Sequence, residues 1–134
     1  RQDRVASIAA IKHSEQIVVT ASVNNVAFGE PVPVGSILTI EAKVSRAFNS
    51  SMEVFIDVWK KNKTNPKKTK VNEAIFTFVA LDQQGKIVKV PPIVPETNLE
   101  KKRYDAALRR RQLSLVLAGK LSAKEATELK ALFD

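Results

Sequence analysis

The sequence lacks cysteine and contains one histidine, His13. Without cysteine there is no disulfide and no thiolate nucleophile, and one histidine leaves too few nitrogen and sulfur ligands for a zinc site. His13 has no serine partner in a G-x-S-x-G elbow, so we expect a solvated or hydrogen-bonded residue at a helix end. A P-loop and a G-x-G-x-x-G motif are also missing. We therefore expect no metal and no cofactor, and only carboxylate chemistry without a serine nucleophile, or no catalysis.

Long apolar runs are missing as well. No run approaches the ~18 residues of a membrane span, and the first residues do not resemble the apolar core of a signal peptide. Together with the missing cysteine, this predicts a cytoplasmic protein without a membrane span. The 134 residues, of which 44% are hydrophobic, suffice for a domain with its own core.

Positive charge is abundant and unevenly distributed. The net charge is +8, and residues 60–70 hold six lysines and no acid. Such a balance favours a polyanionic partner, whether nucleic acid, anionic lipid or a small molecule with phosphates. One alternative function is therefore a basic nucleic-acid or anionic-surface binding module that uses this loop and a basic helix at 99–117. Among the strand residues only Phe55 and Trp59 could stack on bases, so nucleic acid is not the partner we expect.

Hydrophobic periodicity predicts one buried helix followed by strands. Residues 3–13 are apolar on most of the helical circumference, which is typical of a buried helix. The predicted strands are 17–28, 36–47, 52–60 and 71–82, with a short edge strand at 87–90; further helices are predicted at 99–117 and 122–133. No helix separates successive strands, so the pattern favours an α+β fold in which a curved antiparallel sheet wraps around a central helix.

Several local features refine this prediction. The alternation in 17–28 changes phase, which predicts a bulge at Asn24 and Asn25. In 36–47, we expect the even positions from 38 to 44 to face inward. Asp57 and Asp82 are expected to be ordinary surface or turn residues. Thr97 or Asn98 can cap the helix that follows.

The chain begins at Arg1 without a helix-start signal. We therefore expect an upstream strand and the start of the first helix to be missing from it. We predict a main domain at 1–95 and a C-terminal helical extension at 96–134.

Several segments, taken in order, resemble the hotdog-fold acyl-CoA thioesterases of the cytosolic acyl-CoA hydrolase type. They are residues 3–10 (DRVASIAA), 13–14 (HS), 18–28 (VVTASVNNVAF), 31–35 (PVPVG), 49–54 (NSSMEV), 76–85 (FTFVALDQQG), 90–97 (VPPIVPET) and 100–104 (EKKRY). This resemblance implies hydrolysis of fatty acyl-CoA to a free fatty acid and CoA. It also implies dimers with sites at the subunit interface, often assembled into hexamers as trimers of dimers.

The resemblance also implies site residues. The acidic residue of the family lies on the central helix in a motif like Met-Asp-Glu-Val-Ala-Gly, which aligns with residues 2–7 and makes Asp3 the catalytic candidate. Partial desolvation at an interface would raise the pKa of this carboxyl toward that of a useful general base, while direct attack by the carboxylate is the rival mechanism. The loop predicted to bind the CoA nucleotide contains Arg46, Asn49, Ser50 and Ser51. A hotdog protein that binds acyl-CoA without hydrolysing it remains an alternative.

Overall fold

A four-stranded antiparallel sheet forms the centre of the fold. The computed structural model describes residues 2–61 and 67–117. The strands are β1 (Ile17–Ala27), β2 (Ile37–Ala47), β3 (Ser51–Lys61) and β4 (Thr69–Leu81), and they lie in the order β1-β4-β3-β2. β3 and β4 are therefore the central strands, and β1 and β2 are the two edges.

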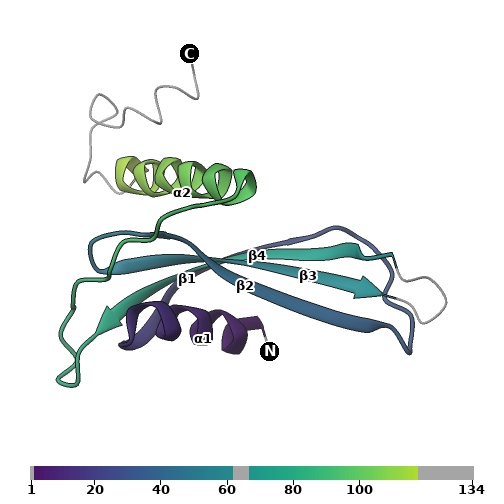
Figure 1. The fold of residues 1–134 in the computed structure, drawn as a ribbon, viewed down its shortest axis with the longest axis horizontal. Helices are drawn as coiled ribbons and strands as arrows, with labels where there is room; N and C mark the ends of the chain where they lie inside the picture. Colours follow the sequence, from purple (N-terminus) through teal and green to yellow (C-terminus); the bar gives the residue numbers. More distant parts are fainter. Residues whose placement is uncertain (1, 62–66, 118–134) are drawn as a thin grey trace, which may run out of the picture. The chain divides into compact units, whose positions relative to one another are not determined.

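Helix α1 (Gln2–Ser14) lies along one face of this sheet (Figure 1). Its small residues Ala6 and Ala10 are fully buried and allow close contact with the strands. The core beneath them consists of alternate residues of the central strands: Met52, Val54, Ile56, Val58, Ala74, Phe76, Phe78 and Ala80. The rings of Phe76 and Phe78 stack with centroids 5.9 Å apart. This arrangement is the predicted α+β hotdog architecture.

The prediction that α1 is buried around most of its circumference is wrong for a single chain. Its buried residues are Ala6, Ala10 and Ser14, which are four apart and form one stripe. Ile8 is 57% exposed and Ile11 is 45% exposed. The sheet of one chain covers only one side of the helix, so the opposite apolar side remains uncovered.

The end of α1 has two local features. The buried Ser14 hydroxyl donates a hydrogen bond of 2.8 Å to the Ala10 carbonyl. Glu15 then takes a left-handed conformation with φ 57°, and its N–H donates to the Ile11 carbonyl at 2.7 Å. This geometry closes the helix and turns the chain into β1, although glycine is the usual residue at such a position.

The bulge in β1 lies elsewhere than the sequence suggests. The pairing of β1 with β4 shifts between Thr20 and Ser22, not at Asn24 and Asn25. Val18 and Thr20 pair with core residues of β4, and after the shift Val23 takes the position opposite Phe76. The apolar alternation at odd positions therefore includes residues such as Ile17 that face away from the core, which displaced the predicted bulge. β1 carries no charged residue, and each of its residues but Val18 is exposed.

Two further expectations need correction. Ile40, Ala42 and Val44 of β2 pack against the core as predicted, but Leu38, near the start of the strand, is 46% exposed. Residues 87–90 do not form a strand. They contribute one bridge, between Leu81 and Ile87, and hydrogen bonds from the N–H groups of residues 88 and 90.

The chain divides into two compact units, Arg1–Ile93 and Val94–Asp134. The second contains helix α2 (Asn98–Leu117). Thr97 is its N-cap: the hydroxyl accepts the Glu100 N–H at 3.0 Å, and the Glu100 carboxylate accepts the Thr97 N–H at 3.4 Å. The predicted helix at 122–133 and the centre of the lysine-rich loop lie outside the described residues. Within the described ranges, no helix is long and apolar enough to cross a membrane.

Candidate active site

Asp3 lies in the first turn of α1, with its side chain exposed in the single chain. One carboxylate oxygen accepts the N–H of Arg4 at 2.9 Å. In the single chain the pKa of Asp3 lies below its ordinary value, and the Arg4 N–H that its carboxylate accepts lowers it. The pKa of Asp3 is therefore shifted in the opposite direction from the increase that we expected for a desolvated interface carboxylate. Burial by another surface would be needed to raise this pKa.

The predicted CoA loop is a tight turn between β2 and β3. The Phe48 N–H donates to the Ser51 carbonyl at 2.8 Å, and the Ala80 N–H donates to the Ser50 carbonyl at 3.0 Å. Asn49 is exposed at the tip, Ser50 is half-buried and Ser51 is buried. The turn thus has a fixed backbone, and the Asn49 side chain is the most accessible of these polar groups.

Arg46 enters this turn from the end of β2 and is half-buried. Its guanidinium carbon lies 5.9 Å from the centre of the Phe48 ring, a cation–π distance. The aromatic ring restricts where the guanidinium can lie. The structure therefore brings Arg46 together with the turn at 48–51, as expected for residues of one binding loop.

Asp3 and the turn lie toward opposite ends of α1. His13 Nε2 lies 2.8 Å from the Pro91 carbonyl oxygen, and the neighbouring N–H of Val90 donates to the Asn49 carbonyl at 2.8 Å. The turn is therefore tied to the C-terminal end of the helix. Ten residues of helical rise separate His13 from Asp3, about 15 Å. One chain does not bring Asp3 and the CoA loop into one site.

His13 is a hydrogen-bonded residue at a helix end, as the sequence indicates. Its ring nitrogen ties the end of α1 to the segment after β4. That role is structural and uses one of its two ring nitrogens.

Asp57 is a buried residue of β3, so its interpretation as an ordinary surface residue is wrong. It is 7% exposed, and its carboxylate lies 2.9 Å from the ammonium of Lys70, which also lies 2.9 Å from Glu73. Burial lowers the pKa of Lys70, but hydrogen bonds and charges from Asp57 and Glu73 more than offset it, so the pKa lies above its ordinary value. Asp82, by contrast, accepts the N–H groups of residues 84 and 86 in a turn, as predicted.

Lys60, Lys68 and Lys70 of the basic segment have partners in their own chain. Lys70 lies 5.0 Å and Lys68 5.8 Å from the centre of the Trp59 ring. Lys60 contacts Glu30 and the Pro31 carbonyl. These contacts reduce the positive charge that is available to a polyanion and weaken the prediction of a nucleic-acid surface.

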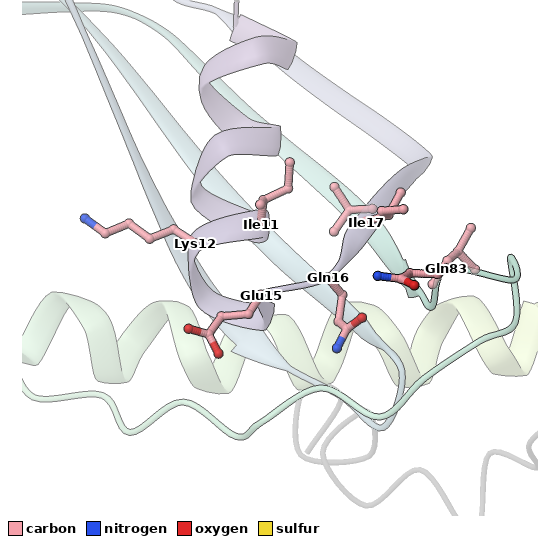
Figure 2. Close-up of a pocket in the computed structure, with 8 residues that line it drawn as sticks. Ile11, Lys12, Glu15, Gln16, Ile17 and Gln83 are labelled. Carbon is pink, nitrogen blue, oxygen red and sulfur yellow. The ribbon is translucent and has the colours of Figure 1, made fainter.

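A surface pocket lies at the C-terminal end of α1 (Figure 2). Its lining comes from α1, from the connection to β1 and from the ends of β1 and β4: Ile11, Lys12, Glu15, Gln16, Ile17, Val18, Leu81 and Gln83. Neither Asp3 nor the turn at 48–51 contributes to it. Among residues 2–61 and 67–117, no three His, Cys, Asp or Glu side chains gather closely enough to hold a metal ion.

Comparison with known proteins matches residues 2–67 to the thioesterase superfamily. Acyl-coenzyme A thioesterase 11 of Mus musculus is 40% identical over 116 residues, which are 87% of this chain and 19% of that protein. A crystal structure described as an apo-hexameric acyl-CoA thioesterase is 33% identical, with a TM-score of 0.80, over 87% of this chain and 74% of that one.

A second solved structure is that of an acyl-CoA hydrolase from Staphylococcus aureus in complex with butyryl coenzyme A, coenzyme A and coenzyme A disulfide. It is 37% identical, with a TM-score of 0.78, over 96% of this chain and 77% of that one. The chain spans less than two thirds of the length of the curated relatives it matches. The sheet order, the helix on its face and these matches agree, and the chain belongs to the thioesterase superfamily and has its hotdog fold.

Proposed function

We propose that this chain is the hotdog domain of an acyl-CoA thioesterase that hydrolyses fatty acyl-CoA to a free fatty acid and CoA. The observation that carries the proposal is the match over 96% of the chain to a hydrolase solved with butyryl coenzyme A and coenzyme A. The curated relatives are also named acyl-CoA thioesterases or hydrolases. CoA enters as part of the substrate, and no separate cofactor or metal is proposed.

The catalytic unit that we propose is a dimer joined through β1. This strand is an open edge of eleven residues without a charge, and Val19, Val23 and Val26 on it are 45 to 53% exposed. Unpaired backbone groups on such an edge favour pairing with another strand. Antiparallel pairing of two copies would reverse the second α1 relative to the first. The start of one helix would then approach the other copy's turn at 48–51, which unites residues that one chain keeps apart.

Asp3 is the proposed catalytic carboxylate. Structures of the Staphylococcus aureus hydrolase include alanine variants of an aspartate and of a threonine that follows it by seventeen residues. Thr20 follows Asp3 by the same interval, and its side chain is exposed on β1. We infer that Asp3 of one copy and Thr20 of the other belong to one site, a pair that the sequence pattern alone did not reveal. The signal was the spacing between the two residues.

In the proposed reaction the Asp3 carboxylate takes a proton from water while the water oxygen bonds to the thioester carbonyl carbon. The tetrahedral intermediate then expels the CoA thiolate, which receives the proton back from Asp3. Backbone N–H groups at the start of a helix suit the developing oxyanion. Direct attack by the carboxylate would instead give an anhydride on Asp3, which water hydrolyses.

The CoA nucleotide is proposed to lie on the loop from Arg46 to Ser51. A guanidinium binds phosphate with paired N–H donors, and the exposed Asn49 amide and the Ser50 hydroxyl can add hydrogen bonds. Ser51 is buried in the single chain, so its hydroxyl is the least accessible of the proposed donors. The net charge of +8 suits a ligand that carries several phosphate charges.

The test is release of free thiol from a panel of acyl-CoA esters. Asp3→Asn should lower turnover at least ~100-fold, the usual contribution of a general base, while CoA binding by calorimetry and the thermal unfolding curve remain. Asp82→Asn is the matched control, because Asp82 accepts backbone N–H groups in a distant turn. Wild-type turnover in the Asp3 variant would refute this mechanism.

Two further results would change the assignment. CoA binding without turnover by the wild type would identify a binding protein on the same fold. A single turnover in ¹⁸O-labelled water tests the anhydride route: ¹⁸O in the Asp3 carboxylate would establish it, because general-base attack places the label in the fatty acid alone, whereas water can open the anhydride at either carbonyl carbon.

Assembly and location are proposed at a coarser level. Several solved relatives are described as hexameric, so we propose a trimer of dimers, testable by light scattering. A cytoplasmic location is supported by the word cytosolic in the names of relatives. The predicted division into a main domain at 1–95 and a helical extension at 96–134 stays a proposal.

A further inference from the structure

Strand β2 changes face at Ser45. Ile40, Ala42 and Val44 pack toward the core, and the pairing with β3 then shifts between Val44 and Arg46. After the shift Ala47 lies opposite Met52 and packs against the core, while Arg46 lies opposite Glu53. Ser45 is therefore the extra residue of a bulge.

The bulge is fixed by a buried polar contact. The Ser45 hydroxyl lies 2.7 Å from a carboxylate oxygen of Glu53 and 3.1 Å from its carbonyl oxygen. Ser45 is 8% exposed and Glu53 is 5% exposed. A buried carboxylate is costly unless it accepts hydrogen bonds, so the contact favours this bulge over a regular strand.

The shift determines where Arg46 lies. In a regular strand, position 46 would continue the inward series of Ala42 and Val44 and would direct a guanidinium into the apolar core. With the bulge, Arg46 lies on the opposite face of the sheet, and its guanidinium carbon is 5.9 Å from the centre of the Phe48 ring. The contact between Ser45 and Glu53 thus holds the guanidinium at the entrance of the turn at 48–51.

We propose that Ser45 and Glu53 are positioning residues that hold Arg46 for the phosphates of the CoA nucleotide. This inference rests on the proposed function, and it adds two buried residues that act through Arg46 without touching the substrate. It predicts that their loss affects only substrates that carry the nucleotide.

The test compares two substrates of Ser45→Ala. For an acyl-CoA ester the KM should rise about tenfold with kcat changed less than about twofold, the loss of one charge-assisted phosphate contact. For the N-acetylcysteamine thioester of the same acid, which lacks the phosphates, kcat/KM should not change. The double variant Ser45→Ala/Arg46→Met should bind acyl-CoA no more weakly than Arg46→Met, because both changes remove the same contact. Glu53→Gln keeps an acceptor for the Ser45 hydroxyl and should retain the wild-type KM.

Ser14→Ala is the matched control. Ser14 is also buried and its hydroxyl donates a hydrogen bond of 2.8 Å, but its acceptor is the Ala10 carbonyl within α1, on the face of the sheet opposite to Arg46. The proposal would be overturned if Ser45→Ala lowered kcat/KM equally for both substrates. It would also be overturned if the effects of Ser45→Ala and Arg46→Met on acyl-CoA binding were additive in the double variant. If the wild type hydrolyses neither substrate, the proposed function is wrong. The variants are then compared by the dissociation constant of CoA, measured by calorimetry, in place of KM. Absence of CoA binding by the wild type would overturn the positioning role as well.

Discussion

The uncovered side of α1 gives the sharpest prediction about assembly. Ile8 is 57% exposed in the single chain. Full burial of an isoleucine stabilises by about 1.5–3 kcal/mol, so the part still exposed corresponds to about 1–1.7 kcal/mol per copy if a second chain covers it. In a two-fold symmetric dimer each copy contributes the same patch, which doubles the effect to about 2–3 kcal/mol.

Ile8→Ser should therefore weaken the dimer on the order of a hundredfold, since each 1.4 kcal/mol is a factor of ten. Sedimentation equilibrium over a range of concentrations measures this dissociation constant directly. Ile8→Val, which keeps most of the apolar area, should weaken the dimer by less than about fivefold. The circular dichroism of the dilute variants should remain that of the wild type, because Ile8 contributes little to the monomer core.

A dissociation constant of Ile8→Ser within about threefold of the wild-type value would refute this reasoning. It would mean that the exposed side of α1 is not covered in the dimer. The catalytic proposal would then lose the desolvation that it requires for Asp3.

Two more predictions concern stability. Lys70→Met should lower the free energy of unfolding by about 2 kcal/mol at pH 7, because it removes the cation that lies 2.9 Å from the buried Asp57 carboxylate. Since the pKa of Lys70 is raised in the folded state, its contribution is full below the ordinary lysine value of 10.5 and declines as the pH rises through the folded value. We expect urea unfolding of the wild type and of Lys70→Met to give free energies of unfolding that differ by a constant amount from pH 7 to about 9. This difference should shrink above about pH 10.5, and a difference that grows there would contradict the assignment. Glu15→Gly should raise the free energy of unfolding by about 0.5 kcal/mol, because glycine removes the strain of the left-handed conformation at φ 57° but loses more chain entropy on folding. Glu15→Ala keeps the strain, so an equal increase in the free energy of unfolding from this variant would disprove the account.

The sequence predicted the elements well because their periodicities are strong. Residues 3–13 were expected as a helix and α1 is Gln2–Ser14; the four long strands agree equally closely. Alternation with period two and the turns at 29–35 and 48–51 leave few other arrangements. Thr97 was one of two expected caps, and Glu100 completes its capping box.

Burial was harder to predict, because it depends on which helix and strand faces pack against each other in the folded chain. The composition of α1 suggested a helix covered all round, yet one sheet covers one stripe of it. Asp57 was interpreted as a surface residue because its partner, the half-buried Lys70, comes from another strand. A bulge was expected in β1 at Asn24 and Asn25, but the pairing shifts between Thr20 and Ser22. The sequence could not distinguish the two positions, because valines that are exposed and valines that face the core show the same alternation.

The site was predictable in part. Asp3 and the loop residues followed from resemblance, but local patterns cannot reveal that one chain separates them by the length of a helix. The bulge at Ser45 did leave a signal: the inward apolar series 40, 42, 44 continues at 47, an interval of three. An odd interval in a strand marks an extra residue, and a serine within it suggests a polar contact that fixes it.

The two edges of the sheet differ in how they are protected. β2 carries Glu41, Lys43 and Arg46 along its edge, whereas β1 has no charge, no proline and only a single bulge to discourage unwanted pairing. Charged edge residues are a common defence against aggregation, and β1 lacks that defence. A chain whose β1 edge is uncovered is thus exposed to unwanted pairing, and a variant that weakens the proposed dimer should also aggregate more readily at the same concentration. The same uncharged edge that suits β1 for pairing with a second copy therefore makes the uncovered chain prone to aggregation.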